Sequence, residues 1–119
     1  MIAGYLIDPV TRTISARPYD GDHRSIYALI GCDTFDAARF DDSLDVVYVD
    51  DEGLMKPQEA FFWFPDMIPT PLAGKGFLLG TDRHGEAITP ERPLGFYGAR
   101  IVFLSAMTVV AMARAGRFD

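Results

Sequence analysis

Residues 44–49 read Leu-Asp-Val-Val-Tyr-Val, and the turn sequence Asp50-Asp51-Glu52-Gly53 follows them directly. A strand formed by this run is apolar on both faces, which is typical of a strand in the middle of a sheet. Residues 34–40 predict the other strand of a pair, joined to the first through Asp41-Asp42-Ser43. We therefore expect a sheet that contains residues 44–49 as an interior strand.

The N-terminal residues predict a hairpin. Residues 2–7 and 13–18 fit two strands, and Asp8-Pro9 between them opens a turn. The second strand alternates apolar and polar residues, as expected for an antiparallel hairpin with one face in water.

A short helix is expected next. Apolar residues recur at helical spacing over residues 26–30, and Gly31 can end the helix in a left-handed conformation. Asp20 or Asp22 can accept hydrogen bonds from its first amides. The helix is amphipathic and must lie on the sheet.

The rest of the chain alternates between ambiguous and clear segments. Residues 58–64 fit either strand or helix, and the prolines after them predict a long loop within residues 54–74. The clearer segments are a strand at 76–81, a turn at 82–86, a connection at 89–93 and a helix at 105–115. Residues 94–104 leave strand and helix open, and the pattern at 99–104 favours a strand. The fold class is thus α+β: a mainly antiparallel sheet of about five to six strands, with one short helix on it and a C-terminal helix, in one domain spanning residues 1–119.

Composition excludes several functional classes. The 119 residues include 17 acidic and 11 basic side chains, and the net charge of −6 argues against direct nucleic acid binding. The single Cys32 excludes an internal disulfide and fits a reducing compartment, so we expect a cytoplasmic protein. The N-terminus lacks a secretion signal, and the apolar run at 94–113 carries Arg100 in its middle, so we expect no membrane segment.

No motif in the sequence identifies a catalytic residue, a metal ligand or a cofactor site. The acidic run at 50–52 lacks the ligand spacing of a calcium loop, and Gly74-Lys75-Gly76 lacks the remaining elements of a phosphate-binding loop. His23 and His84 have acidic neighbours and could act as general bases, but their predicted positions are typical of surface side chains. Cys32 follows a helix end, where a thiolate is disfavoured.

Four large aromatic residues stand in a row at Phe61, Phe62, Trp63 and Phe64. They cannot all face one core from a single strand or helix, so something must cover part of their surface. The cover is either the proline loop or the C-terminal helix, or else a second copy of the chain or a foreign partner. These four residues are the candidate binding site.

Several turn, cap and strand motifs occur together in the chain: Asp20-Gly21-Asp22, Ile30-Gly31-Cys32, Phe35-Asp36 and the stretches at 49–54, 71–76 and 79–82. Over residues 2–104 they resemble a family of small uncharacterised proteins, a domain of unknown function found in phages and other mobile elements. The resemblance implies a shared fold and a mobile-element origin, and it implies no catalytic residues.

Three functional hypotheses follow. The leading one is a non-catalytic module that binds another protein through an aromatic or acidic surface. The rival is a small enzyme or ligand-binding protein with a pocket near the 65–76 loop, using Lys75, Asp82 and His84 as polar groups. The third is self-association into a homodimer that buries Trp63.

Overall fold

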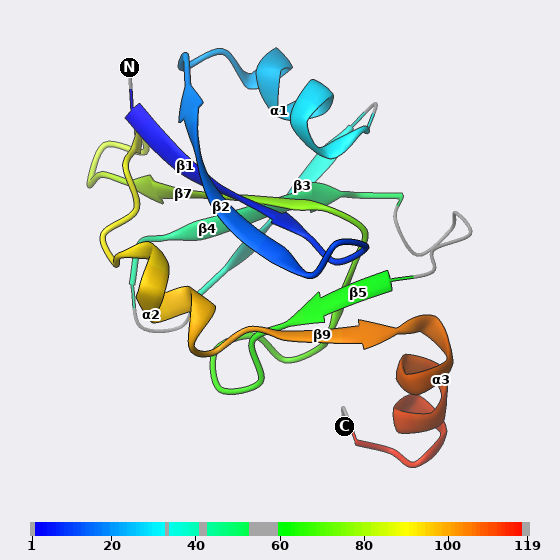
Figure 1. The fold of residues 1–119 in the computed structure, drawn as a ribbon. Coiled ribbons are helices and arrows are strands. Elements are labelled where there is room, and N and C mark those ends of the chain that lie inside the picture. The colour runs from blue at the N-terminus through cyan, green and yellow to red at the C-terminus, as the bar shows by residue number, and fades with distance from the viewer. Residues whose placement is uncertain (1, 33, 41–42, 53–59, 118–119) are drawn as a thin grey trace.

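The computed structural model describes residues 2–32, 34–40, 43–52 and 60–117, and these form two antiparallel sheets and three helices (Figure 1). The larger sheet has the strand order β2-β1-β7-β4-β3, with β8 paired to the end of β7, and the smaller has the order β6-β5-β9. The α+β fold class with a mainly antiparallel sheet is confirmed. The strands are β1 (Ile2–Asp8), β2 (Thr13–Tyr19), β3 (Phe35–Arg39), β4 (Val46–Asp50), β5 (Ala60–Trp63), β6 (Leu72–Ala73), β7 (Gly76–Thr81), β8 (Ala87–Ile88) and β9 (Val102–Ser105), and the helices are α1 (His23–Ile30), α2 (Leu94–Gly98) and α3 (Ala106–Arg114).

Strand β7 is the centre of the larger sheet, because β1 pairs with one of its edges and β4 with the other. Five of its six residues are buried. Strand β4 is also interior, between β7 and β3, as its apolar sequence predicts. The expected β1–β2 hairpin is present, with seven aligned residue pairs.

Helix α1 covers one face of the larger sheet. The carboxylate of Asp22 accepts a hydrogen bond from the Arg24 amide at 2.9 Å, and Gly31 ends the helix with a φ of 68°. Both features agree with the sequence prediction. The buried side of the helix contributes Ile26 and Ile30 to a cluster of side chains that includes Phe77 of β7.

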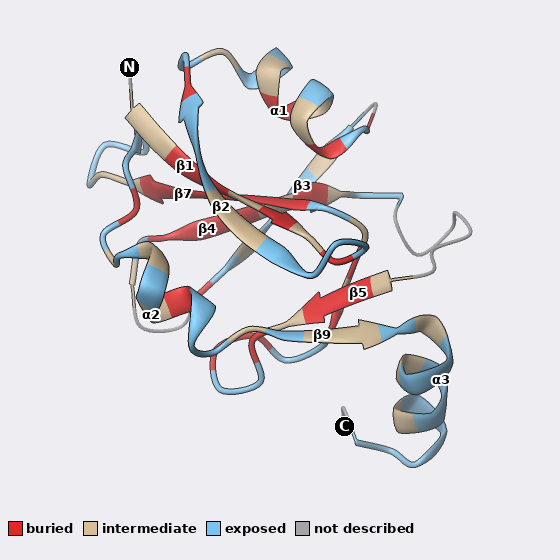
Figure 2. Ribbon diagram, in the orientation of Figure 1, coloured by how far each residue is buried: buried red, intermediate tan, exposed pale blue. Residues whose placement is uncertain are grey.

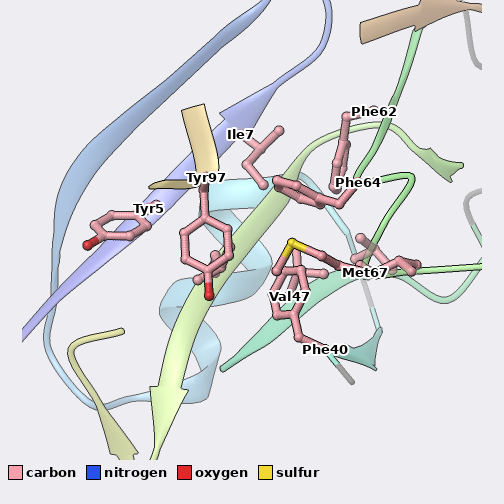
Figure 3. Close-up of a cluster of buried hydrophobic side chains, with 11 residues drawn as sticks. Tyr5, Ile7, Phe40, Val47, Phe62, Phe64, Met67 and Tyr97 are labelled. Carbon is pink, nitrogen blue, oxygen red and sulfur yellow. The ribbon is translucent and has the colours of Figure 1, made fainter. Parts of the chain in front are cut away.

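The smaller sheet covers the opposite face of the larger one. Side chains of a strand alternate between its two faces, so Phe77 and Leu79 point to α1 while Leu78 points to the smaller sheet. The main core lies between the sheets and contains residues of β1, β4, β5, β7 and α2 (Figure 3). Gly76 allows the close approach, because a Cβ there would lie 2.6 Å from the Phe62 ring.

The structure decides two segments of the C-terminal half that the sequence left open. Residues 60–63 form strand β5 in a second sheet, where strand and helix were both possible. Residues 94–104, also open between strand and helix, contain the five-residue helix α2 and then a strand that begins at Val102, three residues later than predicted. Helix α3 follows as expected, with Ser105 as its N-cap.

Parts of some predicted connections lie outside the described residues: Asp41 and Asp42 of the turn before β4, Gly53 of the turn after it, and residues 54–59 of the predicted loop. Residues 64–71, which follow β5, are the irregular chain that the prolines predict. No helix in the described part of the chain is both long enough and apolar enough to cross a membrane.

Candidate protein-docking surface

The four consecutive aromatic residues divide between the two faces of the smaller sheet. Phe62 and Phe64 belong to the main core and have no exposed area. The Phe64 ring packs edge-on against Phe40 and Tyr97, with centroid distances of 5.4 and 5.7 Å (Figure 3). These two residues therefore offer nothing to a partner in this conformation.

The proline loop covers part of Trp63, which lies with Phe61 on the other face of the smaller sheet. The Trp63 indole donates a hydrogen bond to the carbonyl of Ile68 at 2.8 Å. The same loop is tied back by the amides of Met67 and Ile68, which both donate to the Phe64 carbonyl at 2.9 Å. Phe61 is buried and Trp63 keeps partial exposure. Of the four candidate binding residues, Trp63 is thus the one that retains exposed surface.

Strand β9 extends the face that carries Trp63. Trp63 stands opposite Val102, and Phe61 opposite Leu104, so these four side chains share the outer face of the smaller sheet. Val102 is 39% exposed and Leu104 is partly exposed. The outer face is therefore apolar and incompletely covered along β9.

Helix α3 follows β9 directly in the chain and carries a second set of exposed apolar side chains. None of its nine residues is buried, and Met107 and Val110 are 84% and 48% exposed (Figure 2). A shallow groove of about 360 Å³ runs along one stripe of the helix, lined by Ala106, Met107, Val110, Ala111 and Arg114. We define the β9–α3 surface as Val102, Leu104, Met107, Val110 and Ala111.

The C-terminal segment that carries the β9–α3 surface is basic although the protein is acidic. All but one of the 17 acidic residues lie at or before Glu91, whereas residues 92–117 contain four arginines and no acidic residue. Arg92 and Arg100 both stack on the Phe96 ring, with guanidinium carbons 4.4 and 3.7 Å from the ring centroid. The segment that carries this surface therefore combines exposed apolar side chains with positive charge, and Arg114 brings that charge to the groove itself.

Lys75, Asp82 and His84 do not converge on a pocket. Lys75 precedes β7 and Asp82 follows it, so the strand separates them by roughly 20 Å at about 3.3 Å per residue. The Asp82 carboxylate instead closes its own turn, accepting hydrogen bonds from the amides of His84 and Glu86 at 2.8 and 2.9 Å. The His84 side chain is exposed in that turn.

A different set of residues lines a groove beside the proline loop. This groove of about 180 Å³ is bordered by β3, the end of β4 and residues 70–73, and its lining includes three aspartates, Asp36, Asp50 and Asp51. Within the described ranges, no three His, Cys, Asp or Glu side chains are arranged to hold a metal ion.

Comparison with known proteins places most of this structure in one family. A family model described as Domain of unknown function (DUF3846) matches residues 2–97. The chain belongs to this family. An uncharacterized protein, y4iR of Sinorhizobium fredii (strain NBRC 101917 / NGR234), is 40% identical over 90 residues, which are 73% of this chain and 54% of the relative. The chain thus spans about half the length of that relative, and no solved structure matches it.

The DUF3846 segment includes both sheets except β9, together with α1 and nearly all of α2. The β9–α3 surface lies beyond residue 97, so it is an addition to the matched segment. Neither the family description nor the relative's name assigns a reaction or a partner.

A buried carboxylate inside the DUF3846 segment was not singled out by sequence reasoning. Asp45 is 1% exposed and accepts hydrogen bonds from the Glu91 and Arg92 amides, at 2.8 and 3.3 Å, and from the Tyr97 hydroxyl. Burial, followed by the hydrogen bond to Asp45, raises the pKa of Tyr97. The one sequence signal is an aspartate inside the apolar run 44–49. With all these donors supplied by its own chain, Asp45 ties residues 91–97 to the core.

Proposed function

We propose that this protein is a non-catalytic module that binds another protein through the β9–α3 surface. One observation carries the proposal: α3 buries none of its residues and exposes Met107 almost completely. Exposed apolar side chains that cluster are typical of interaction sites, whereas single ones are common on any protein. Three of the six large apolar residues that are most exposed in the described chain fall within residues 102–110: Val102, Met107 and Val110.

The positions of the reactive side chains support a non-catalytic role. The Cys32 thiol is buried. His84 lies in a surface turn, where the neighbouring Asp82 carboxylate accepts hydrogen bonds from backbone amides. The buried Asp45 is occupied by hydrogen bonds within the fold. These groups hold the structure together or lie apart from one another, which does not favour a reaction centre.

The test compares retention of a partner by matched variants. The purified chain is immobilised and exposed to host lysate, alongside a Met107→Lys/Val110→Lys double variant and a Leu44→Lys control. Leu44 is 53% exposed but lies outside the β9–α3 surface. We expect a protein that the unchanged chain and the control retain and that the double variant loses. Equal retention by all three would contradict the proposal.

We also propose a mobile-element origin and a cytoplasmic location. The resemblance of the turn and cap motifs to phage-associated proteins supports the first, and a single cysteine, Cys32, supports the second. Recurrent placement of the gene among chromosomal housekeeping genes would contradict the origin, and recovery of the protein in a periplasmic or secreted fraction would contradict the location.

The groove beside the proline loop favours a second candidate, a small-ligand-binding protein. Its three aspartates suit a cationic ligand rather than an anionic one. In a thermal-shift screen of small amines, a ligand at this groove would raise the melting temperature of the unchanged chain and not that of Asp50→Asn/Asp51→Asn. A screen without such a ligand would leave protein binding as the better account.

A further inference from the structure

Strand β9 has an open edge as far as the described residues show. Among them it pairs only with β5 in the smaller sheet, whose order is β6-β5-β9. Beyond that pairing, the backbone hydrogen bonds found among the described residues include none to residues 102–105. An edge strand directs part of its N–H and C=O groups outward, and these can pair with another extended chain.

The other edge strands carry features that discourage such pairing. Strand β2 contains Arg17 and Pro18, and β3 contains Asp36 and Arg39. Strands β6 and β8 have two residues each. Charges, proline and short length are the usual means by which edge strands avoid joining other chains.

Strand β9 lacks charge and proline. Its four residues read Val-Phe-Leu-Ser, so it is short but longer than β6 and β8, which have two residues each. Val102 and Leu104 form an apolar outer face, and the exposed helix α3 begins directly after the strand (Figure 1). An added strand would therefore gain backbone hydrogen bonds from β9 and apolar contacts from its outer face.

The basic residues near β9 indicate which kind of chain would bind at its open edge. Arg100 lies two residues before β9, Arg114 lines the groove on α3, and no acidic residue occurs within residues 92–117. A second copy that paired β9 with β9 antiparallel about a two-fold axis would place Arg100 of each copy beside helix α3 of the other, which also carries a basic residue, Arg114. An acidic segment would meet opposite charge, which favours association.

We propose that the open edge of β9 receives an extended segment of a foreign protein that alternates apolar and acidic side chains and adds a strand to the smaller sheet. The inference rests on the proposed protein-binding function and specifies its mode and the chemistry of the partner. Backbone pairing supplies affinity in this mode, and alternate side chains supply specificity.

The test uses capped hexapeptides of alternating glutamate and valine as the probe, titrated into isotopically labelled full-length chain and followed by NMR. We expect amide shifts centred on residues 102–105. Replacing glutamate by lysine should weaken peptide binding at least tenfold. N-methylation of the valine amides, whose N–H groups all lie on one edge of the extended peptide, should weaken it as much, because that edge can no longer donate hydrogen bonds to β9. A methylated peptide that binds equally well, or shifts centred elsewhere, would overturn strand addition.

Protein variants test the charge argument. Arg100→Glu should weaken binding of the glutamate peptide several-fold, while Arg83→Glu, in the exposed turn after β7, should leave it unchanged. Circular dichroism verifies that both variants fold. Equal effects of the two substitutions would contradict recognition of acidic side chains at β9.

Two further outcomes separate this inference from the proposed function. If lysate capture responds to Met107→Lys/Val110→Lys while no peptide binds, strand addition is rejected and protein docking stands. If sedimentation shows a dimer that the peptide does not dissociate, a second copy covers the edge and the foreign segment is rejected.

Discussion

The Tyr97 hydroxyl donates a hydrogen bond to the carboxylate of Asp45, which lies 52 positions earlier in the chain. Tyr97 comes from α2 and Asp45 from the residue before β4, so the bond joins the last helix of the DUF3846 segment to the larger sheet. Tyr5 adds a second tie, since its hydroxyl donates to the Arg92 carbonyl at 3.0 Å. Both ties hold the short segment that leads into β9.

Removing the Tyr97 hydroxyl should destabilise the fold. In Tyr97→Phe the buried Asp45 loses one donor and keeps its two backbone amides, so we expect a loss of about 1–3 kcal/mol in the free energy of unfolding. Urea denaturation measures it. Tyr27→Phe, on the α1 side of the larger sheet, serves as the control and should change stability by less than about 0.5 kcal/mol. Equal stability of Tyr97→Phe and the unchanged chain would show that the bond contributes nothing.

Stability should fall at alkaline pH. Burial and the Asp45 hydrogen bond raise the pKa of Tyr97 above its ordinary value of 10.0, so the folded chain keeps a proton that the unfolded chain releases. Stability is therefore complete below pH 10.0 and declines as the pH rises above it. Denaturation curves measured from about pH 8 to about pH 11 should show a steeper decline for the unchanged chain than for Tyr97→Phe.

The contact between the two sheets should be sensitive to one methyl group. Gly76→Ala places a Cβ 2.6 Å from the Phe62 ring, and we expect a loss of about 1–3 kcal/mol from overpacking. Gly95→Ala is the matched control, because nothing lies within 4 Å of the place that its added methyl group would take. The melting temperature of Gly76→Ala should be well below that of Gly95→Ala. The opposite order would show that the two sheets do not require a glycine at position 76.

The docking variants should fold normally. Because Met107 and Val110 are exposed and no residue of α3 is buried, Met107→Lys/Val110→Lys should change the free energy of unfolding by less than about 0.5 kcal/mol per substitution. It should also reduce binding of a hydrophobic dye to the native protein. A large loss of stability in this variant would mean that α3 supports the core. The variant's failure to retain a partner would then reflect unfolding and not the loss of a docking surface.

Local signals account for what the sequence predicted well. The sequence predicted that an aspartate, here Asp22, caps the start of α1 and that Gly31 ends it, because helix capping and left-handed termination depend on neighbouring residues. The apolar run at 44–49 predicted an interior strand because burial on both faces appears directly in the composition. The second sheet was not predicted, since β5 and β9 are four-residue strands that lie about 40 positions apart. Strand and helix stayed open at α2 because its five residues include Gly95 and Gly98 and lack a side-chain cap.

The candidate site was predicted less well than the fold. Sequence reasoning drew attention to the aromatic run, and its alternation then placed Phe62 and Phe64 inside and left Trp63 partly exposed. It did not anticipate that α3 would leave its apolar side chains uncovered, because an apolar helix usually packs on a core. Nor could it pair Asp45 with Tyr97, since partners so distant in sequence are set by the tertiary fold.

The uneven distribution of charge along the chain has a kinetic consequence. Negative side chains dominate up to Glu91 and arginines dominate after it, so the molecule carries a permanent electric dipole between its sheets and its C-terminal region. In the field of an approaching polyanionic surface such a dipole rotates the molecule before any contact forms. Encounter would then be fast in dilute buffer and would slow as ions shorten the reach of that field.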